Sequence, residues 1–178
     1  MTKLNKYIER GGNLLIAGGA GKQSVMNPIV EQFGVKFLPG RLVKVSENFD
    51  PDFIIARPTK EAHDIAYIFE TLYRREYVVT IPGSTALEYT EDKGFKVTPL
   101  FVSDTIGSWN EVETTDFLDD TVRLNPAAGE VERSYPTVLA LSRQMGDKEQ
   151  RIVILGDADC LSNGEISISR KDVPAANY

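Results

Sequence analysis

The chain has 178 residues, of which 42% are hydrophobic and 26% charged, and its formal net charge is −6. This length suits one domain with its own core, spanning residues 1–178. The acidic balance excludes a nucleic-acid-binding protein, because phosphate binding needs a basic surface. The single cysteine, Cys160, and the single histidine, His63, exclude an internal disulfide and a multi-histidine metal site, and we expect no cofactor.

Nothing in the sequence has the form of a membrane or export segment. No apolar run approaches the roughly 20 residues that cross a bilayer, and residues 1–7 lack the apolar region of a signal peptide. Taken literally, the chain would be cytoplasmic. It opens in a predicted helix with no strand before it, however, and no terminating element follows at its end. We therefore expect a segment of a longer polypeptide.

The stretch 10–22 organises the predicted fold. Leu4, Tyr7 and Ile8 share one face of a short helix that ends at Gly11. Residues 14–17 form an apolar run that suits a strand covered on both faces. The glycines that follow force a turn before the next helix. Helix, buried strand, glycine loop and helix form the unit of an α/β sheet, which holds ligands at the carboxyl ends of its strands.

Further helices and strands follow from the spacing of apolar residues. A helix begins at Asn27 and Pro28, or at Lys22 if it is longer and kinked, and ends at Gly34. Residues 35–37 and 42–45 suggest a hairpin. After a strand at 53–56, a regular helix begins near residue 58. Its predicted buried face consists of Ala62, Ile65, Ala66, Phe69, Leu72 and Tyr73.

The second half of the chain predicts more strands. These lie at 77–81 and at 96–103, where Pro99 indicates an edge or a bulge. Residues 104–136 read as a long polar loop. Strands at 137–141 and 151–155 are joined too closely for a crossover helix and should be antiparallel. The predicted fold class is α/β, a three-layer sandwich with a mixed, mostly parallel sheet, flavodoxin-like or class I glutamine-amidotransferase-like, with an antiparallel hairpin near the C-terminus.

The glycine loop does not match a nucleotide-binding motif. A Walker A loop needs glycine where Ile16 stands and serine or threonine where Gln23 stands. The dinucleotide fingerprint runs from Gly19 through Gly21 but has Ser24 in place of its third glycine. A plain strand-to-helix turn is the favoured interpretation. Anion capture by free N–H groups of the loop is the alternative.

Three other groups of residues invite a catalytic interpretation. Asp157 and Asp159 follow a strand end and have the spacing of a Mg²⁺-dependent hydrolase, although side-chain capping of the next turn is the commoner use of such residues. Cys160 with His63 is a conceivable nucleophile and base, against a buried thiol. The carboxylates of the long loop suit a solvated surface and lack the spacing of a calcium loop; they are Glu111, Glu113, Asp116, Asp119 and Asp120.

Several segments read in order resemble one family. The opening YIERGGNLLI (7–16) is similar to a Y-I-x-x-G-G-N-L-L motif, and IPGSTALE (81–88) to a P-G-x-x-x-L motif. VTPL (97–100) followed by SWNE (108–111) resembles T-P-L-L … S-W-x-E. VILGDAD (153–159) with Asn163 resembles a closing V-I-G-D-x-D. Together they resemble the auxiliary domain of GldG-type components of ABC transporters, which are gliding-motility-associated or uncharacterised.

The resemblance covers residues 3–163 and carries several expectations. It implies a glutamine-amidotransferase-like sandwich without the catalytic cysteine and histidine. It also implies an extracytoplasmic (periplasmic) domain, tethered by membrane helices and working beside the permease and ATPase subunits of an ABC transporter. The chain departs from the family in lacking the strand that normally precedes the opening helix and in lacking a membrane helix.

We therefore expect a non-catalytic binding or interaction domain of an ABC-type transport system. The rival hypotheses are a Mg²⁺-dependent hydrolase or phosphatase that uses Asp157 and Asp159, and a carbohydrate-binding module that uses Trp109 and the acidic loop. Trp109 is either a core residue or a partner contact. The candidate contacts for a partner, a small molecule or a glycan lie beyond strand ends: Gly18, Gly19, Gly21, Ser84, Thr85, Asp104, Ser108, Trp109, Asp157 and Asp159.

Overall fold

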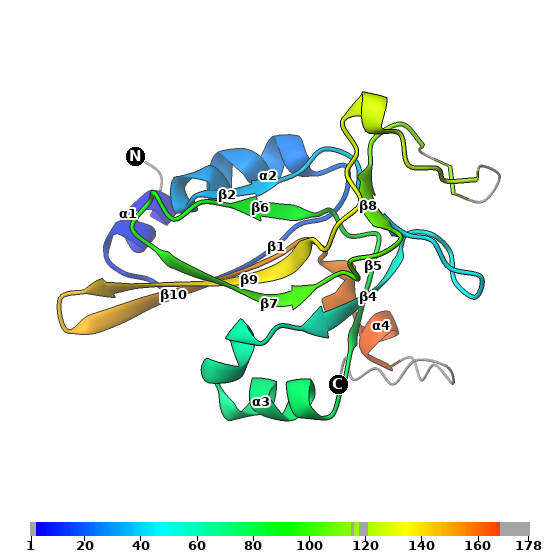
Figure 1. Ribbon diagram of the computed structural model, residues 1–178. Coiled ribbons are helices and arrows are strands. Elements are labelled where there is room, and N and C mark those ends of the chain that lie inside the picture. The colour runs from blue at the N-terminus through cyan, green and yellow to red at the C-terminus, as the bar shows by residue number, and fades with distance from the viewer. Residues whose placement is uncertain (1–2, 115, 118–120, 168–178) are drawn as a thin grey trace.

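The computed structural model describes residues 3–114, 116–117 and 121–167. Its main sheet has six strands in the order β1–β10–β9–β7–β4–β5 (Figure 1). Their bounds are β1 Leu14–Ala17, β4 Phe53–Pro58, β5 Val79–Pro82, β7 Lys96–Val102, β9 Pro136–Met145 and β10 Lys148–Leu155. Only β1 and β10 run parallel, and the other neighbours in this sheet are antiparallel. The prediction of a three-layer sandwich with a mostly parallel sheet is therefore wrong.

Two short antiparallel ribbons accompany the main sheet. One pairs β2 (Val35–Phe37) with β6 (Leu87–Tyr89), and the other pairs β3 (Arg41–Lys44) with β8 (Ser108–Glu111). The predicted hairpin between β2 and β3 is wrong, because the connection between them turns each strand toward a different partner. Leu38 N–H bonds to Ala86 O at 2.9 Å, and Leu42 N–H bonds to Ser84 O at 2.8 Å.

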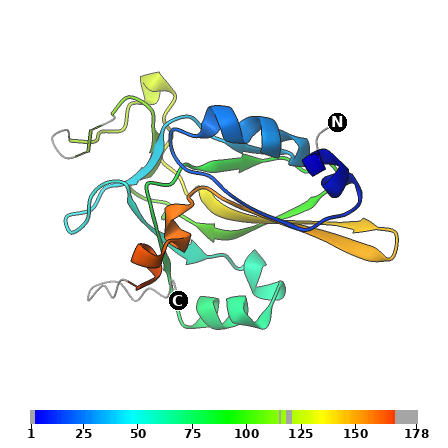
Figure 2. The same cartoon turned by 180° about the vertical axis from the view of Figure 1, so that it is seen from behind.

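Helices and turns complete the chain. The α-helices are α1 (Lys3–Glu9), α2 (Gln23–Val30), α3 (Tyr67–Arg74) and α4 (Asn163–Ser167). Short 3₁₀ helices are η1 (Glu31–Phe33), η2 (Glu61–Asp64), η3 (Pro126–Ala128) and η4 (Asp159–Leu161). α2 and α3 lie on opposite sides of the main sheet in both views (Figures 1 and 2). None of the described helices has the length and apolar composition of a membrane span.

The alternation of side chains in β9 and β10 divides the core between two faces. Leu139 and Ile154 face a cluster with Val30, Phe33 and Phe37, from α2, η1 and β2. The opposite face packs against η2 and α3 and contains Leu42, Ile54, Ile81, Leu100, Phe101, Val138 and Leu155. The predicted antiparallel pairing of β9 and β10 is confirmed. The predicted irregularity at Pro99 is also confirmed, because the register with β9 shifts between Pro99 and Phe101.

The helix and strand that open the chain have the predicted bounds but not the predicted environment. α1 is fixed to the sheet by the buried side chain of Gln150, whose Nε2 donates to Ile8 O at 3.0 Å and to Gly12 O at 2.8 Å. β1 was expected to be covered on both faces, yet Leu15 is 64% exposed. β1 is the terminal strand of the sheet, so it has a neighbour on one edge only.

The second helix begins at Gln23 and contains Pro28, as the kinked alternative predicted. Asn27 does not cap it. Instead, the Asn27 side chain accepts from Phe37 N–H at 2.8 Å and donates to Phe37 O at 3.1 Å, so it serves as a pairing partner for β2. Gly34 ends the following turn in the left-handed conformation, at φ 77°, as its position predicted.

The helix predicted from residue 58 is interrupted. η2 ends at Asp64, Ala66 takes an extended conformation, and α3 begins only at Tyr67. Because of this break, the residues before and after it no longer lie on one helix face. Of the six residues predicted on the buried face only Ala62 is fully buried, Phe69 and Leu72 are half-buried, and the others are exposed; these are Ile65, Ala66 and Tyr73.

Candidate functional site

Three loops that follow strands meet at one end of the sheet. They comprise residues 18–21, 83–85 and 156–159. Gly18 N–H bonds to Leu155 O at 3.0 Å, and Thr85 N–H bonds to Gly156 O at 3.0 Å. Gly156 N–H in turn bonds to Thr137 O at 2.8 Å. The structure therefore brings five candidate contacts from three separate stretches into one junction: Gly18, Ser84, Thr85, Asp157 and Asp159.

The serine and threonine at this junction hold the backbone together. Both side chains are completely buried. Ser84 Oγ donates to Thr85 O at 3.1 Å, and Thr85 Oγ1 donates to Leu38 O at 2.7 Å. The approach is so close that a Cβ on Gly156 would lie 2.2 Å from Thr85 O. These two hydroxyls are therefore committed to structure and have no access to a ligand.

The glycines of the first loop differ in what surrounds them. A Cβ on Gly18 would lie 2.4 Å from the ring of Phe37, whereas a Cβ on Gly19 would meet nothing within 4 Å. Gly21 has a φ of 77°, which favours glycine. Gly18 thus permits close packing of the loop on Phe37, and Gly21 permits the turn into α2. These roles match the plain strand-to-helix turn favoured from the sequence.

A cavity of about 270 Å³ lies beside this loop, between Gly21, Gln23, Arg41 and Glu111. Its polar side chains have partners. Arg41 Nη1 contacts Asp52 Oδ2 at 2.5 Å, and Gln23 Nε2 donates to Gly40 O at 2.9 Å. No charged side chain is left free to hold an anion among these lining residues. The cavity therefore adds no support to the anion-binding alternative.

Asp157 caps the turn that follows β10. Its carboxylate is buried, and its two oxygens accept from the N–H groups of Asp159 and Cys160, each at 2.8 Å. Burial raises the pKa of Asp157 above its ordinary value, against the lowering effect of these two amides. Asp159 is exposed. Within the described ranges, no group of three histidine, cysteine or carboxylate side chains is placed to hold a metal ion.

The cysteine and the histidine do not form a pair. Cys160 is buried, and its Sγ donates to Asp157 O at 3.5 Å. His63 Nδ1 contacts Asp64 Oδ1 at 2.9 Å, and its Nε2 faces Glu70 at 3.9 Å. Burial, reinforced by the charge of Asp157, raises the pKa of the Cys160 thiol to about 12. A thiol with this pKa is protonated at neutral pH and is a poor nucleophile.

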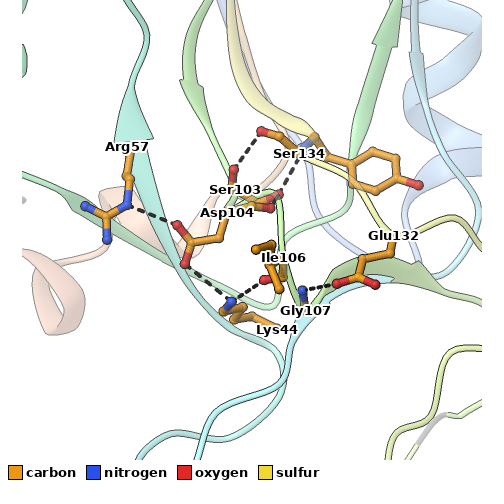
Figure 3. A network of polar contacts seen from close by, with 9 residues as sticks. Lys44, Arg57, Ser103, Asp104, Ile106, Gly107, Glu132 and Ser134 are labelled. Atoms are coloured by element: carbon orange, nitrogen blue, oxygen red, sulfur yellow. Dashed lines mark hydrogen bonds and ion pairs between the residues drawn. The ribbon is translucent and has the colours of Figure 1, made fainter.

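Asp104 joins three parts of the chain at the surface (Figure 3). Its Oδ1 lies 3.0 Å from Arg57 Nε in β4, and its Oδ2 lies 3.6 Å from Lys44 Nζ in β3. Lys44 Nζ also donates to Ile106 O, and Gly107 N–H donates to Glu132 (Figure 3). The three charged side chains are partly exposed, so each ion pair contributes little free energy. The network fixes the connection between β7 and β8.

The stretch predicted as a long polar loop contains β8 and η3, and its tryptophan is a core residue. Trp109 is buried in a small cluster with Val43 and Val122. Its Nε1 donates to Glu111 Oε2 at 3.1 Å. The partner-contact alternative for Trp109 is therefore wrong, and no face of its indole is free to stack on a sugar ring.

Glu111 was expected to be solvated, yet it is buried. Its Oε1 accepts from the N–H groups of Glu113 and Thr114, each at 2.9 Å. Burial alone would raise the pKa of Glu111, but these amides and the Trp109 indole lower it below its ordinary value. The side chain acts as an internal cap for the loop. The predicted acidic residues Asp119 and Asp120 lie outside the described residues.

Ser108, the remaining candidate contact, lies opposite Lys44 in the β3–β8 register and is completely buried. Its Oγ has no hydrogen-bond partner within the part of the chain that the structure describes. Ser108 O accepts from Arg133 N–H at 3.0 Å, so the backbone of this residue is fixed. Burial removes Ser108, like Trp109, from the surface that a partner could touch.

Sequence reasoning missed a set of exposed apolar side chains on α3 and just before it, which we call the α3 surface. It consists of Ile65, Tyr67, Ile68 and Tyr73. Two of these residues, Ile65 and Tyr73, were predicted to be buried. These residues are exposed because the helix is interrupted near Ala66. The sequence does not reveal the interruption, because the apolar spacing also fits one continuous helix. The α3 surface has the exposure that the buried predicted contacts lack, which are Ser84, Thr85, Ser108, Trp109 and Asp157.

Comparisons with known proteins give a likeness among solved structures. No family model matches the chain, and no curated protein matches it. Among solved structures, the chain is similar to one described as "mmIFT52 N-terminal domain", with a TM-score of 0.52 and 12% identity. The match covers 86% of this chain and 57% of that chain, so this chain spans little more than half the length of that structure.

This likeness concerns the fold alone, because the identity is low. The similar structure is an IFT52 domain, and the match gives no support to the flavodoxin-like or glutamine-amidotransferase-like sandwich that was predicted. Together with the mostly antiparallel sheet, it corrects the predicted fold class.

Replacing Gly18 by alanine is expected to destabilise the protein by about 1–3 kcal/mol, because the new methyl group collides with the buried ring of Phe37. Gly19→Ala is the matched control. Its Cβ meets nothing within 4 Å and its φ is not positive, so the change should stay within about 0.5 kcal/mol. Urea unfolding of both variants measures the difference. Equal losses would contradict the packing assigned to this loop.

Cys160 is expected to resist alkylation in the folded protein, because its thiol is buried and has a pKa of about 12. Iodoacetamide at pH 8 should label it only at the rate at which the protein unfolds, and completely in urea. Mass spectrometry gives the labelled fraction directly, since the chain has one cysteine. Rapid labelling of the native protein would instead indicate a reactive thiol and revive the nucleophile hypothesis.

Proposed function

We propose that this chain is a non-catalytic binding domain that recognises another protein through the α3 surface. One observation carries the proposal. α3 has no fully buried residue, and large apolar side chains project from it and from the residue that precedes Ala66. Tyr67 is 82% exposed and Ile68 is 56% exposed. Large apolar side chains exposed on one short element suit a contact surface.

The shape of this surface favours a protein partner over a small ligand. Small-molecule sites are concave and enclose most of the ligand, whereas Tyr67 projects from the helix. A furrow of about 680 Å³ runs beside it, between η2 with Ile65 on one side and Lys96 to Pro99 of β7 on the other. A projecting apolar surface next to an open furrow suits a partner protein of complementary shape.

Positive charge at the end of α3 indicates which residue types the partner surface should contain. Arg74 and Arg75 end α3, and both are exposed. Arg74 Nη2 contacts Glu70 at 2.9 Å, while Arg75 Nη1 donates to Tyr77 Oη at 3.5 Å. Tyrosine and arginine are the residue types that most often dominate binding energy in interfaces. The partner surface should therefore present an apolar hollow flanked by a carboxylate.

The roles of the candidate catalytic residues support the non-catalytic part of the proposal. Asp157 uses both carboxylate oxygens to cap a turn, and Cys160 is buried beside it. Trp109, on which the carbohydrate-binding hypothesis relied, is in the core. Each of these groups already has a structural partner, so a reaction at this end of the sheet would have to break the junction.

The class of partner comes from the family resemblance of the sequence segments. It supports the permease and ATPase subunits of an ABC transporter as the partners, and the extracytoplasmic side of a membrane as the location. In this proposal the α3 surface is the part of the domain that contacts the transporter.

Photo-crosslinking in cells tests the proposal. With p-benzoylphenylalanine in place of Tyr67, we expect an adduct with a transporter subunit, identified by mass spectrometry. Ile68→Asp should reduce that adduct at least about tenfold, because it places a charge in the centre of the contact. Ile106, which is 76% exposed on the β7–β8 connection, is the control position and should give no such adduct.

Two results would contradict the proposal. One is the same set of adducts from positions 67 and 106, which would indicate random encounter. The other is Mg²⁺-dependent hydrolysis of a phosphate ester by the purified protein that is abolished by Asp157→Asn, which would establish the hydrolase alternative.

A further inference from the structure

The outer edge of β1 is an unpaired strand edge. Gly18 N–H bonds to Leu155 O across the parallel pair. Because residues of a strand alternate in direction, Leu14 and Ile16 bond toward β10, and Leu15 and Ala17 turn their N–H and C=O groups away from it. β1 is the last strand in the sheet order, and within the described residues no other strand pairs with it. Such an edge is a template for another strand.

Two other strand edges of the main sheet are protected, and β1 is not. β5, at the other end of the sheet, contains Pro82 and packs against η4. The open part of β7 carries Pro99, and its Val97 N–H is occupied by Glu91 Oε1 at 3.1 Å. β1 has neither proline nor lysine, and residues 11–21 are entirely uncharged. Apart from its short length, β1 lacks the features that keep an edge from pairing.

Apolar side chains accompany the free backbone groups. Leu15 is 64% exposed on the face of the sheet opposite α2. In the strand register it lies beside Val153, which lies beside Ala140, and both of these are only half-buried. A strand added outside β1 would therefore gain hydrogen bonds and place a side chain next to Leu15, at the end of this apolar row.

We propose that the added strand is β1 of a second copy of this chain, paired antiparallel about a two-fold axis at Ile16. This register places Leu15 opposite Ala17 of the second copy, and each such pair exchanges both of its N–H···O=C bonds. A large side chain then meets a small one on each side of the axis. The same edge serves both copies, as a two-fold interface requires.

Charge favours a second copy at this edge over other places on the molecule. Two chains with a net charge of −6 each repel one another. The stretch 11–21 is uncharged, so it adds nothing of its own to that repulsion. The α3 surface follows β4, toward the other end of the sheet order, so the dimer leaves it free for a partner. The inference does not depend on the proposed function.

Sedimentation velocity of the full chain tests this inference. From about 1 to about 300 µM, we expect the mass to rise from monomer to dimer by mass action. Leu15→Pro removes an outward N–H and leaves the bonds of Leu14 and Ile16 to β10 intact, so it should keep the protein monomeric over the whole range. Leu15→Lys should do the same without altering the backbone. Val25→Lys is the matched control, since Val25 is 63% exposed on α2.

Hydrogen exchange identifies the interface. The amides of Leu15 and Ala17 should exchange freely at low concentration and slow at least about tenfold in the dimer, whereas amides of α3 should not change. A chain that remains monomeric at about 300 µM would overturn the inference. So would a dimer that forms equally well with Leu15→Lys and with Val25→Lys, or one that protects α3 instead of β1.

Discussion

The fold depends on the contact of three chain segments at Gly156. Its N–H bonds to Thr137 O, and its C=O accepts from Thr85 N–H, so a single residue links the ends of β9 and β10 to the connection between β5 and β6. The absence of a side chain is essential, because a Cβ would lie 2.2 Å from Thr85 O. Gly18 N–H, bonded to Leu155 O, brings β1 to the same place. Residues far apart in sequence are thereby fixed at one end of the sheet.

This junction explains why the residues that suggest catalysis are not arranged as a catalytic site. The backbone groups of a crowded loop cluster need partners because they are shielded from water. Ser84, Thr85 and Asp157 supply those partners with their side chains. Exposed apolar side chains of the described residues lie elsewhere, among other places on α3 and at the edge of β1. These surfaces are apolar and open, which suits association with polypeptides better than chemistry on a small substrate.

Local features of the fold could be predicted from the sequence. The bounds of β1, the antiparallel hairpin of β9 and β10, the bulge at Pro99 and the longer helix that contains Pro28 follow from apolar runs and from proline. The pairing of strands could not be predicted in the same way. β2 and β3 look like a hairpin, but each finds a partner far along the chain. Backbone bonds of Leu38 to Ala86 and of Leu42 to Ser84 accompany these pairings, and periodicity does not reveal them.

The sequence placed the candidate contacts beyond strand ends, but it did not predict that several of them hold the fold together. Segments that follow strands did converge, yet burial of Ser108, Trp109 and Asp157 depends on distant neighbours. Native-state hydrogen exchange tests most directly whether the junction is structural. The account predicts that the amides of Gly18, Thr85 and Gly156 exchange only through global unfolding, with the free energy of the best protected amides of β9 and β10. Exchange of these three amides by local opening, at a much lower free energy, would contradict it.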